Sequence, residues 1–216
     1  MIQHVYERAM SCPEISEVYI ATDDERISEC VLDFGGKAVM TEQAHRSGTD
    51  RISEAAVKMG VKKGDIIVNI QGDQPLLHPS TVSRLIKPLL EDQAIPMTTL
   101  KWEMKDIGDI KNPNHVKVVS DRKGFAIYFS RCPLPFFRDA ESRHVYYKHL
   151  GFYAFRMEFL LKFTRLSQGV LEAAEKLEQL RALEHGFKIK VVETPFNSIE
   201  VDVPEDVMRV EEILVG

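Results

Sequence analysis

The chain has 216 residues, of which 44% are hydrophobic and 28% are charged, a balance typical of a globular protein with enough apolar material for a full core. Its 28 basic and 33 acidic residues give a net charge of -5, which argues against a general nucleic-acid-binding protein. No apolar run approaches the roughly 20 residues of a membrane span, and we expect neither a signal peptide nor a membrane partner. The three cysteines form no C-x-x-C pair, which favours a cytoplasmic protein without a cysteine metal cage.

Helical and extended patterns alternate through the first half of the chain. Apolar residues at i, i+3, i+4, i+7 and i+8 predict an amphipathic helix over 2–10. Capping residues, glycines and apolar runs then predict the following elements in chain order: a strand at 18–21, a helix ended by Gly35-Gly36, a strand at 39–40, a helix begun by the box Ser47-Gly-Thr-Asp50, a strand at 65–70 buried on both faces, and a helix at 79–91 kinked at Pro88. This alternation is typical of a parallel sheet with crossover helices.

The second half has a different pattern. It predicts a hairpin over 116–129, a strand at 151–155, helices at 157–166 and 171–186, a strand at 188–193, and a last helix opened by Pro204. The connection 132–148 is longer than most, which indicates a functional loop or an interface arm. We therefore expect an α/β protein with a mixed, mostly parallel sheet flanked by helices and with an inserted arm.

Polar clusters follow several of these strands, where open α/β sheets bind their ligands. They are 41–50, 71–75 and Asp202 before Pro204. Asp73 can hold Mg²⁺ while phosphates and waters complete the coordination, but Asp and Gly are also ordinary turn residues. Asp202 can supply a second carboxylate or cap the last helix. On spacing alone, the turn interpretation is favoured.

Several common catalytic signatures are missing from the sequence. It has no Walker loop, no G-x-G-x-x-G fingerprint, no G-x-S-x-G elbow and no H-E-x-x-H pair. His149 and Tyr153 are four residues apart, which puts both on one face of a strand. Glu178 and Gln179 fall in an amphipathic helical pattern, where a solvated pair is the simplest expectation.

A series of stretches nevertheless resembles one family, the 3-deoxy-manno-octulosonate cytidylyltransferases, in order and over almost the whole chain. The stretches are His45–Arg51, Val68–Pro75, Asn112–Val119, Tyr128–Arg131, His149–Arg156, Leu177–Arg181 and Val201–Asp206. Together they are far more specific than any one of them, and they reverse the preference for a simple turn at Asp73 and Asp202.

This resemblance implies a single Rossmann-like nucleotidyltransferase domain over 1–216, with an arm at about 112–150, that forms a homodimer. The family transfers a cytidylyl group from CTP to 3-deoxy-D-manno-octulosonate (Kdo), with Mg²⁺, giving CMP-Kdo and pyrophosphate for lipopolysaccharide biosynthesis. By resemblance, Asp73 and Asp202 hold the metal, Gln71, Ser47, Gly48 and Thr49 contact the nucleotide, and Arg131, His149, Tyr153, Glu178 and Gln179 bind the sugar acid. Asp73, Asp202 and Arg131 are the implied catalytic residues.

The chain departs from the family at its N-terminus. Family members begin with a strand and a loop of the form P-A-R-x-x-S-x-R-x-x-G-K-x-L that cradles the triphosphate, whereas Met1–His4 matches the sequence just after that loop. We therefore expect one central strand and the basic phosphate grip to be missing, through a start at an internal methionine or in a variant with impaired catalysis. Two other functions stay open: a nucleotide-sugar glycosyltransferase, disfavoured because Gln71-Gly-Asp73 replaces D-x-D, and a non-catalytic subunit.

Overall fold

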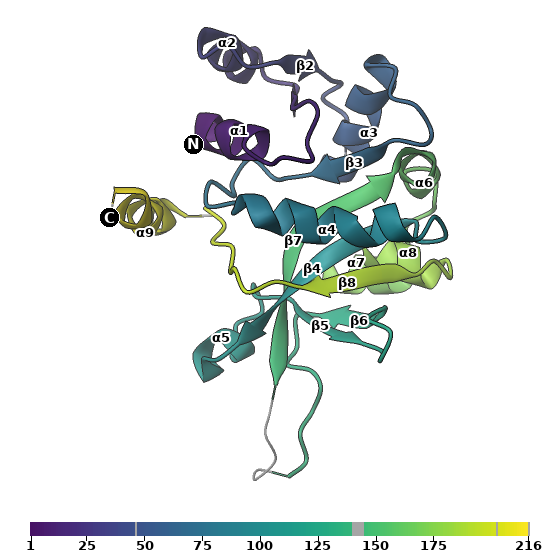
Figure 1. Ribbon diagram of the computed structural model, residues 1–216. Helices are drawn as coiled ribbons and strands as arrows, with labels where there is room; N and C mark the ends of the chain where they lie inside the picture. Colours follow the sequence, from purple (N-terminus) through teal and green to yellow (C-terminus); the bar gives the residue numbers. More distant parts are fainter. Residues whose placement is uncertain (46, 140–144, 202, 216) are drawn as a thin grey trace.

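The computed structural model describes residues 1–45, 47–139, 145–201 and 203–215 (Figure 1). The helices within these ranges are α1 (Ile2–Met10), α2 (Glu25–Asp33), α3 (Gly48–Lys58), α4 (Pro79–Glu91), α5 (Ile107–Lys111), α6 (Met157–Phe163), α7 (Val170–Glu175), α8 (Leu180–Glu184) and α9 (Pro204–Val215). The strands are β1 (Ile20–Thr22), β2 (Ala38–Met40), β3 (Ile66–Asn69), β4 (Met97–Met104), β5 (Lys117–Ser120), β6 (Ala126–Ser130), β7 (Tyr146–Arg156) and β8 (Ile189–Glu193). No helix in the described ranges is long and apolar enough to cross a membrane.

The larger sheet has six strands in the order β6-β5-β7-β4-β8, with β3 paired to β7. Its β4–β8 pair is parallel, whereas the pairs β3–β7, β4–β7, β5–β6 and β5–β7 are antiparallel. The expected mixed α/β sheet is confirmed. The expected parallel majority is not met among the described strands, because the long strand β7 runs antiparallel to the strands on both of its sides.

The remaining strands, β1 and β2, form a separate parallel pair in which Ile20 lies opposite Ala38. In the described part of the chain, β1 pairs with β2 alone and β3 pairs with β7 alone. Each therefore has one edge without a strand partner among the described residues.

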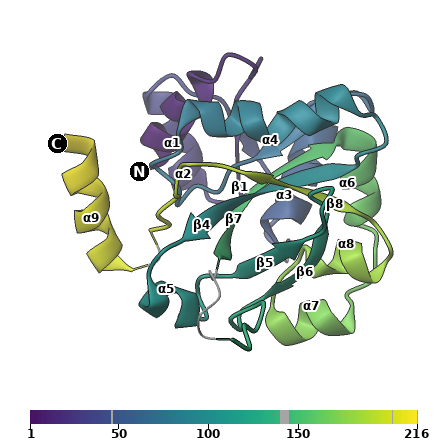
Figure 2. The same cartoon turned by 60° about the horizontal axis from the view of Figure 1, so that its bottom comes forward.

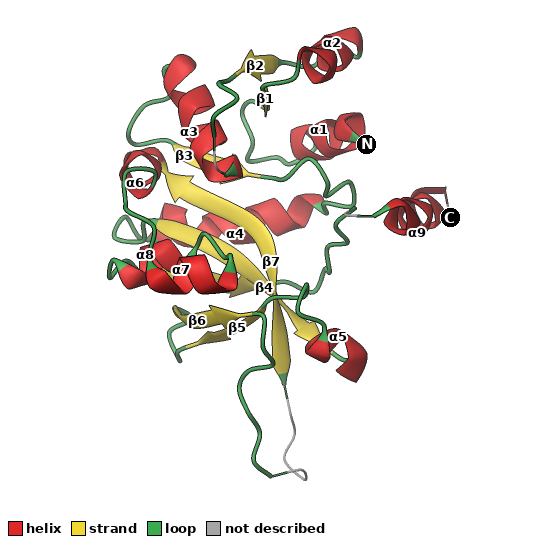
Figure 3. Cartoon of the chain, turned by 180° about the vertical axis from the view of Figure 1, so that it is seen from behind, coloured by secondary structure: helices red, strands yellow, loops and turns green. Residues whose placement is uncertain are grey.

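Helices cover both faces of the larger sheet, with α4 on one side and α6, α7 and α8 on the other (Figures 1 and 3). Alternate residues of β7 divide between two cores because successive side chains of a strand point to opposite faces. Phe152 and Ala154 pack with residues of α1 and α4. Tyr153 and Phe155 pack with residues of α3, α6 and α8. The strand predicted at 65–70 also contacts both cores, although most of its residues are only partly buried.

The predicted long helix over 171–186 is divided in two. Lys176 adopts a left-handed conformation with φ of 55° and ends α7, and α8 begins only at Leu180. A left-handed residue cannot continue a right-handed helix. The segment 177–179 is consequently a turn, so Glu178 and Gln179 do not lie on the amphipathic helix that their pattern predicted.

The arm is also narrower than the predicted 112–150. The strands β5 and β6 belong to the sheet, and β7 begins at Tyr146, so residues 146–148 extend a strand instead of ending a loop. In the β6–β7 connection, 131–145, the described residues 131–139 project from the body (Figure 1) and come toward the viewer in Figure 2, whereas 140–144 lie outside the described residues. We call this connection the arm below.

Candidate active site

The N-terminus of α3 forms one wall of the candidate site. The Ser47 side chain caps the helix by accepting a hydrogen bond from the Asp50 amide at 3.2 Å, as its capping-box sequence predicts. Gly48 lies so close to Gln71, which follows β3, that a Cβ placed there would lie 3.0 Å from Gln71 Nε2. A larger residue here would require the Gln71 side chain to shift by a few tenths of an ångström.

Glu178 reaches the same wall from the turn between α7 and α8. Its Oε1 accepts a hydrogen bond from the fully buried Thr49 hydroxyl. Burial raises the pKa of Glu178, and hydrogen bonds from Thr49 and Ser47 oppose that shift. Among the described residues, its buried Oε2 has no hydrogen-bond partner, and neither has the buried Nε2 of Gln179. Buried polar groups are normally paired, so the unpaired oxygen of Glu178 is suited to receive a polar group of a ligand.

These residues surround a cavity of about 860 Å³, which we call the first cavity. It is lined by Ala44, His45, Ser47, Gly48, Asp50, Ser53, Glu54, Gln71, Thr164, Leu166, Gln168, Glu172, Lys176, Glu178 and Arg181. Its wall contains carboxylate, amide and hydroxyl groups, which are the hydrogen-bonding partners that a hydroxyl-rich or amide-bearing ligand requires.

The turn after β3 brings the two expected metal-binding segments together. Gln74 N–H donates to Gln71 O at 3.3 Å and closes the turn around Asp73. The Val201 amide donates to Asp73 O at 2.9 Å, and the next residue, Asp202, lies outside the described residues. The described segment that leads to Asp202 is not a strand, contrary to expectation, because its backbone bonds to this turn instead of a strand ladder. Within the described ranges, no three His, Cys, Asp or Glu side chains form a metal-binding group.

His149 and Tyr153 lie on the same face of β7, with ring centroids 5.5 Å apart, as their spacing predicts. His149 Nε2 lies 2.8 Å from Thr99 Oγ1 on β4. Burial, and secondarily the charge of Lys148, lower the pKa of His149 to about 3, so its imidazole is neutral near neutral pH. Burial also raises the pKa of Tyr153 well above its usual value. Both rings therefore act as neutral hydrogen-bonding groups.

Arg131 follows β6 and is held by backbone oxygens. Its Nε donates to Glu175 O at 2.8 Å and its Nη1 to Pro113 O at 3.0 Å, and its amide donates to the Glu175 carboxylate at 2.9 Å. Because these contacts fix the guanidinium plane, its position is set without a ligand.

A second cavity of about 320 Å³ adjoins Arg131. It is lined by Asn114, Val116, Arg131, Lys148, His149, Gly151 and Glu200. The residues expected to bind the sugar acid are thus divided, because Arg131 and His149 line this second cavity whereas Glu178 lines the first with Ser47, Gly48 and Gln71. The other expected site residues that the structure describes, Thr49, Asp73, Tyr153 and Gln179, line neither cavity.

Five residues near these walls escaped the sequence-based prediction. Asn69 and Gln74 are buried, with Asn69 Nδ2 and Gln74 Oε1 unpaired among the described residues, and Gln74 Nε2 donates to Glu200 Oε1 at 3.2 Å. The nearly buried Lys148 donates to Ser198 O at 3.2 Å. Asn69, Gln74 and Asn114 fall inside stretches that resemble the family, and Lys148 and Glu200 directly precede such stretches. Their position inside or directly before these stretches is the signal in the sequence that could have identified them.

Comparisons with known proteins identify the class of protein to which this chain belongs. The family model described as cytidylyltransferase matches residues 1–189. The 4-diphosphocytidyl-2C-methyl-D-erythritol synthase of Anaerococcus prevotii superposes with a TM-score of 0.64 at 16% identity, over 100% of this chain and 86% of its own, which shows a shared fold. The chain therefore has the Rossmann-like fold of the nucleotidyltransferases.

Two nearer relatives narrow the assignment. The 3-deoxy-manno-octulosonate cytidylyltransferase of Syntrophus aciditrophicus is 51% identical over 216 residues, which cover 100% of this chain and 87% of the relative. The structure of a CMP:2-keto-3-deoxy-manno-octonic acid synthetase complexed with CTP superposes with a TM-score of 0.92 at 40% identity, over 99% of this chain and 87% of the other. The chain belongs to the 3-deoxy-manno-octulosonate cytidylyltransferase family.

Proposed function

We propose that this chain transfers the cytidylyl group of CTP to Kdo, giving CMP-Kdo and pyrophosphate, and that the product enters lipopolysaccharide biosynthesis. Family membership supports the reaction. The structural observation that carries it is the convergence of the α3 N-terminus, Gln71 and Glu178 on the first cavity, together with a second cavity lined by Arg131, whose guanidinium is held by backbone oxygens.

The two cavities suit the two parts of a sugar-acid reaction. A carboxylate pairs well with the planar donor fork of a guanidinium, so Arg131 is suited to bind the carboxylate of Kdo. The neutral His149 supplies a hydrogen bond without a competing charge. Gln71, Ser47 and Gly48 line the first cavity, which supports their proposed contacts with the nucleotide, and Thr49 contributes by holding Glu178.

The reaction itself requires positioning more than covalent catalysis. The anomeric hydroxyl of Kdo attacks the α-phosphorus of CTP in line while pyrophosphate leaves, so the oxygen of the sugar forms the new P–O bond as the bond to pyrophosphate breaks. In this step Arg131 orients the nucleophilic sugar through its carboxylate. Glu178, with a free carboxylate oxygen among the described residues, accepts hydrogen bonds from ligand hydroxyls.

Mg²⁺ is part of this proposal, with Asp73 and Asp202 as its protein ligands. The residues present fit the ion, because Mg²⁺ is commonly held by one or two carboxylates together with substrate phosphates and waters. The hydrogen bond from the Val201 amide to Asp73 O brings the segment before Asp202 to the same turn. When bound, the ion neutralises phosphate charge as the leaving group departs.

The proposal includes a homodimer in the cytoplasm. Phe136 in the arm is 89% exposed, and neighbouring Phe137 packs edge-on to Tyr146 with ring centroids 5.2 Å apart. A large exposed aromatic side chain next to an anchored one is typical of interface residues. The three free cysteines support a reducing compartment.

A product assay with binding titrations tests the reaction against both alternatives. The chain is incubated with Mg²⁺, CTP and Kdo, and pyrophosphate and nucleoside diphosphate are measured separately. We expect pyrophosphate in amounts equal to CMP-Kdo. Nucleoside diphosphate instead would indicate a glycosyltransferase, and Kdo binding without CTP binding would indicate a non-catalytic subunit.

A further inference from the structure

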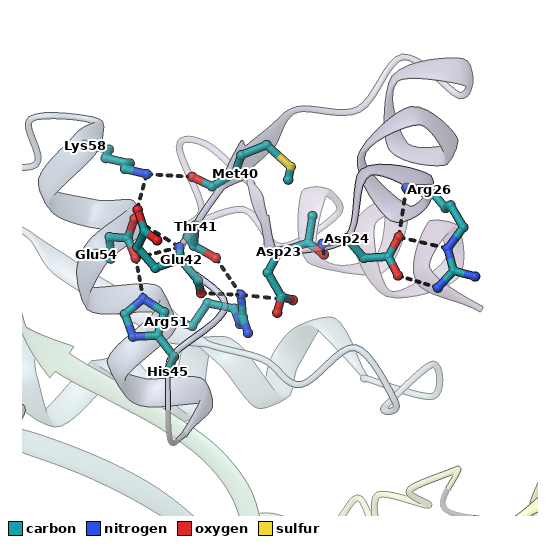
Figure 4. Close-up of polar contacts among 11 residues, drawn as sticks. Asp23, Asp24, Arg26, Met40, Thr41, Glu42, His45, Arg51, Glu54 and Lys58 are labelled. Atoms are coloured by element: carbon teal, nitrogen blue, oxygen red, sulfur yellow. Dashed lines mark hydrogen bonds and ion pairs between the residues drawn. The ribbon is translucent and has the colours of Figure 1, made fainter.

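One face of α3 holds residues 40–45, the segment that begins at the end of β2 and leads toward α3 (Figure 4). Arg51, Glu54 and Lys58 are spaced i, i+3 and i+7, so they lie on the same side of the helix. All three point to this segment (Figure 4). The contacts are therefore set by helical spacing and not by chance encounters of exposed side chains.

Glu54 makes the central contacts. Its Oε2 accepts a hydrogen bond from the Glu42 amide at 3.0 Å and is in contact with His45 Nε2. Its Oε1 lies 2.6 Å from Lys58 Nζ. The Glu54 carboxylate thus binds the segment at two points, the backbone amide of Glu42 and the side chain of His45.

The two neighbours on the helix hold the rest of the segment. Lys58 Nζ donates to Met40 O at 2.9 Å. Arg51 Nη1 donates to Thr41 Oγ1 at 2.6 Å and lies 3.2 Å from Asp23 Oδ1, at the end of β1. The ionised state of Glu54 is secure, because Lys58, His45 and the Glu42 amide lower the pKa of its carboxyl to about 2.

The held segment forms part of the wall of the first cavity. Ala44 and His45 line the cavity together with Ser47 and Gly48 at the start of α3, and Glu54 lies in the same wall. Loops are held in place by few contacts and are the parts of a fold that open most easily. A displacement of residues 42–45 would therefore change the cavity without unfolding the protein.

We propose that Glu54 is a positioning residue for nucleotide binding, which holds residues 40–45 against α3 so that this wall of the first cavity is formed before CTP arrives. The inference rests on the proposed function, since it takes CTP as the ligand. It concerns affinity and not chemistry, because both carboxylate oxygens of Glu54 are engaged by the segment and by Lys58.

The test uses Glu54→Ala, Glu54→Gln and a matched control, Glu91→Ala. Glu91 also forms an ion pair with a lysine four residues away on its helix, Lys87, at 3.7 Å, but it is exposed on α4 and lines neither cavity. Hydrogen exchange of the Glu42 amide in the ligand-free chain measures how firmly its hydrogen bond to Glu54 is kept. Titration calorimetry measures the dissociation constant for CTP.

In Glu54→Ala we expect the Glu42 amide to exchange at least about ten-fold faster. We also expect the CTP dissociation constant to rise about ten-fold, which is the increase that results if only about one molecule in ten has residues 40–45 in the position that binds CTP. The kcat at saturating CTP and the KM for Kdo stay within about two-fold. Glu54→Gln should lose less CTP affinity than Glu54→Ala, because its amide oxygen can still accept a hydrogen bond from the Glu42 N–H. Glu91→Ala should match the wild type.

Unchanged exchange at Glu42 in Glu54→Ala overturns the inference, and so does faster exchange with unchanged CTP affinity. An equal loss of CTP affinity in Glu91→Ala also overturns it, because the removal of any one negative charge would then explain the result. A wild-type chain that binds CTP but forms no product contradicts the proposed function alone and leaves this test intact. A wild-type chain that does not bind CTP overturns both.

Discussion

Replacing Arg131 with lysine tests the assignment of the second cavity. Arg131 Nε and Nη1 donate to Glu175 O and Pro113 O at 2.8 and 3.0 Å, and a lysine ammonium cannot reproduce this fork and also bind a carboxylate bidentately. A lost charge-assisted hydrogen bond costs about 1.5–3 kcal/mol, which corresponds to a roughly 10- to 150-fold weaker interaction. We expect the KM for Kdo to rise by that factor, with the CTP dissociation constant within about two-fold.

Arg156→Lys is the matched control for this prediction. The Arg156 guanidinium is also held by backbone oxygens, with Nε donating to Ile95 O and Nη2 to Asp92 O, both at 3.0 Å, but it lines neither cavity. Both variants should lose stability in urea unfolding, whereas only Arg131→Lys should change the KM for Kdo in steady-state assays. A CTP defect equal to the Kdo defect, or a Kdo defect of the same size in Arg156→Lys, would refute the reasoning.

The other predictions concern the metal, the Thr49 hydrogen bond, the buried imidazole and the arm. Asp73→Asn should reduce pyrophosphate release by more than about 1,000-fold with an unchanged urea midpoint, and residual activity within a few-fold of wild type would contradict the metal assignment. Thr49→Val should lower the free energy of unfolding by about 1–3 kcal/mol, because Glu178 loses its hydroxyl donor; equal stability of the variant would speak against that contact. The pKa of His149 is about 3 in the folded protein, against about 6.5 for an unperturbed imidazole. The unfolded state therefore binds more protons between these pH values, and the free energy of unfolding should rise with pH there, by at most about 1.4 kcal/mol per pH unit. The same slope in His149→Gln would contradict this. Light scattering at micromolar concentration should give a dimer that Phe136→Ser weakens, and a wild-type monomer would exclude the dimer.

Local signals in the sequence were sufficient for most helices and strands. The Ser47 box predicted the start of α3, and the observed cap is the bond that such a box forms. The hairpin predicted over 116–129 also has a local cause, because in its turn the Asp121 side chain accepts from the Lys123 and Phe125 amides and Gly124 takes φ of 76°. Capping and turn chemistry acts over a few residues, so it can be identified without knowledge of the fold.

Long-range features could not be predicted in the same way. Nothing local indicates that β7 would run antiparallel between β3 and β4 or begin as early as Tyr146. Lys176 has no side-chain feature that announces a left-handed conformation, and the break there, which removes Glu178 from a helix face, depends on tertiary contacts. Propensity is a weak prior that tertiary structure overrides.

The candidate site shows the same division. Periodicity placed His149 and Tyr153 on one face, as observed. The hydrogen bond from Thr49 to Glu178 spans 129 positions of sequence, and only the resemblance to a family pointed to a shared site for such residues. The separation of Arg131 and Glu178 between two cavities was beyond either kind of reasoning, because it depends on the shape of the folded surface.

The central claim is that the α-phosphorus of CTP becomes bonded to Kdo, and CTP labelled at that phosphorus tests it most directly. With Mg²⁺ and Kdo present, the account predicts that the label appears in a sugar phosphodiester while unlabelled pyrophosphate is released in equal amount. Label that stays in a nucleoside diphosphate, or in CTP while Kdo is bound, would contradict the account.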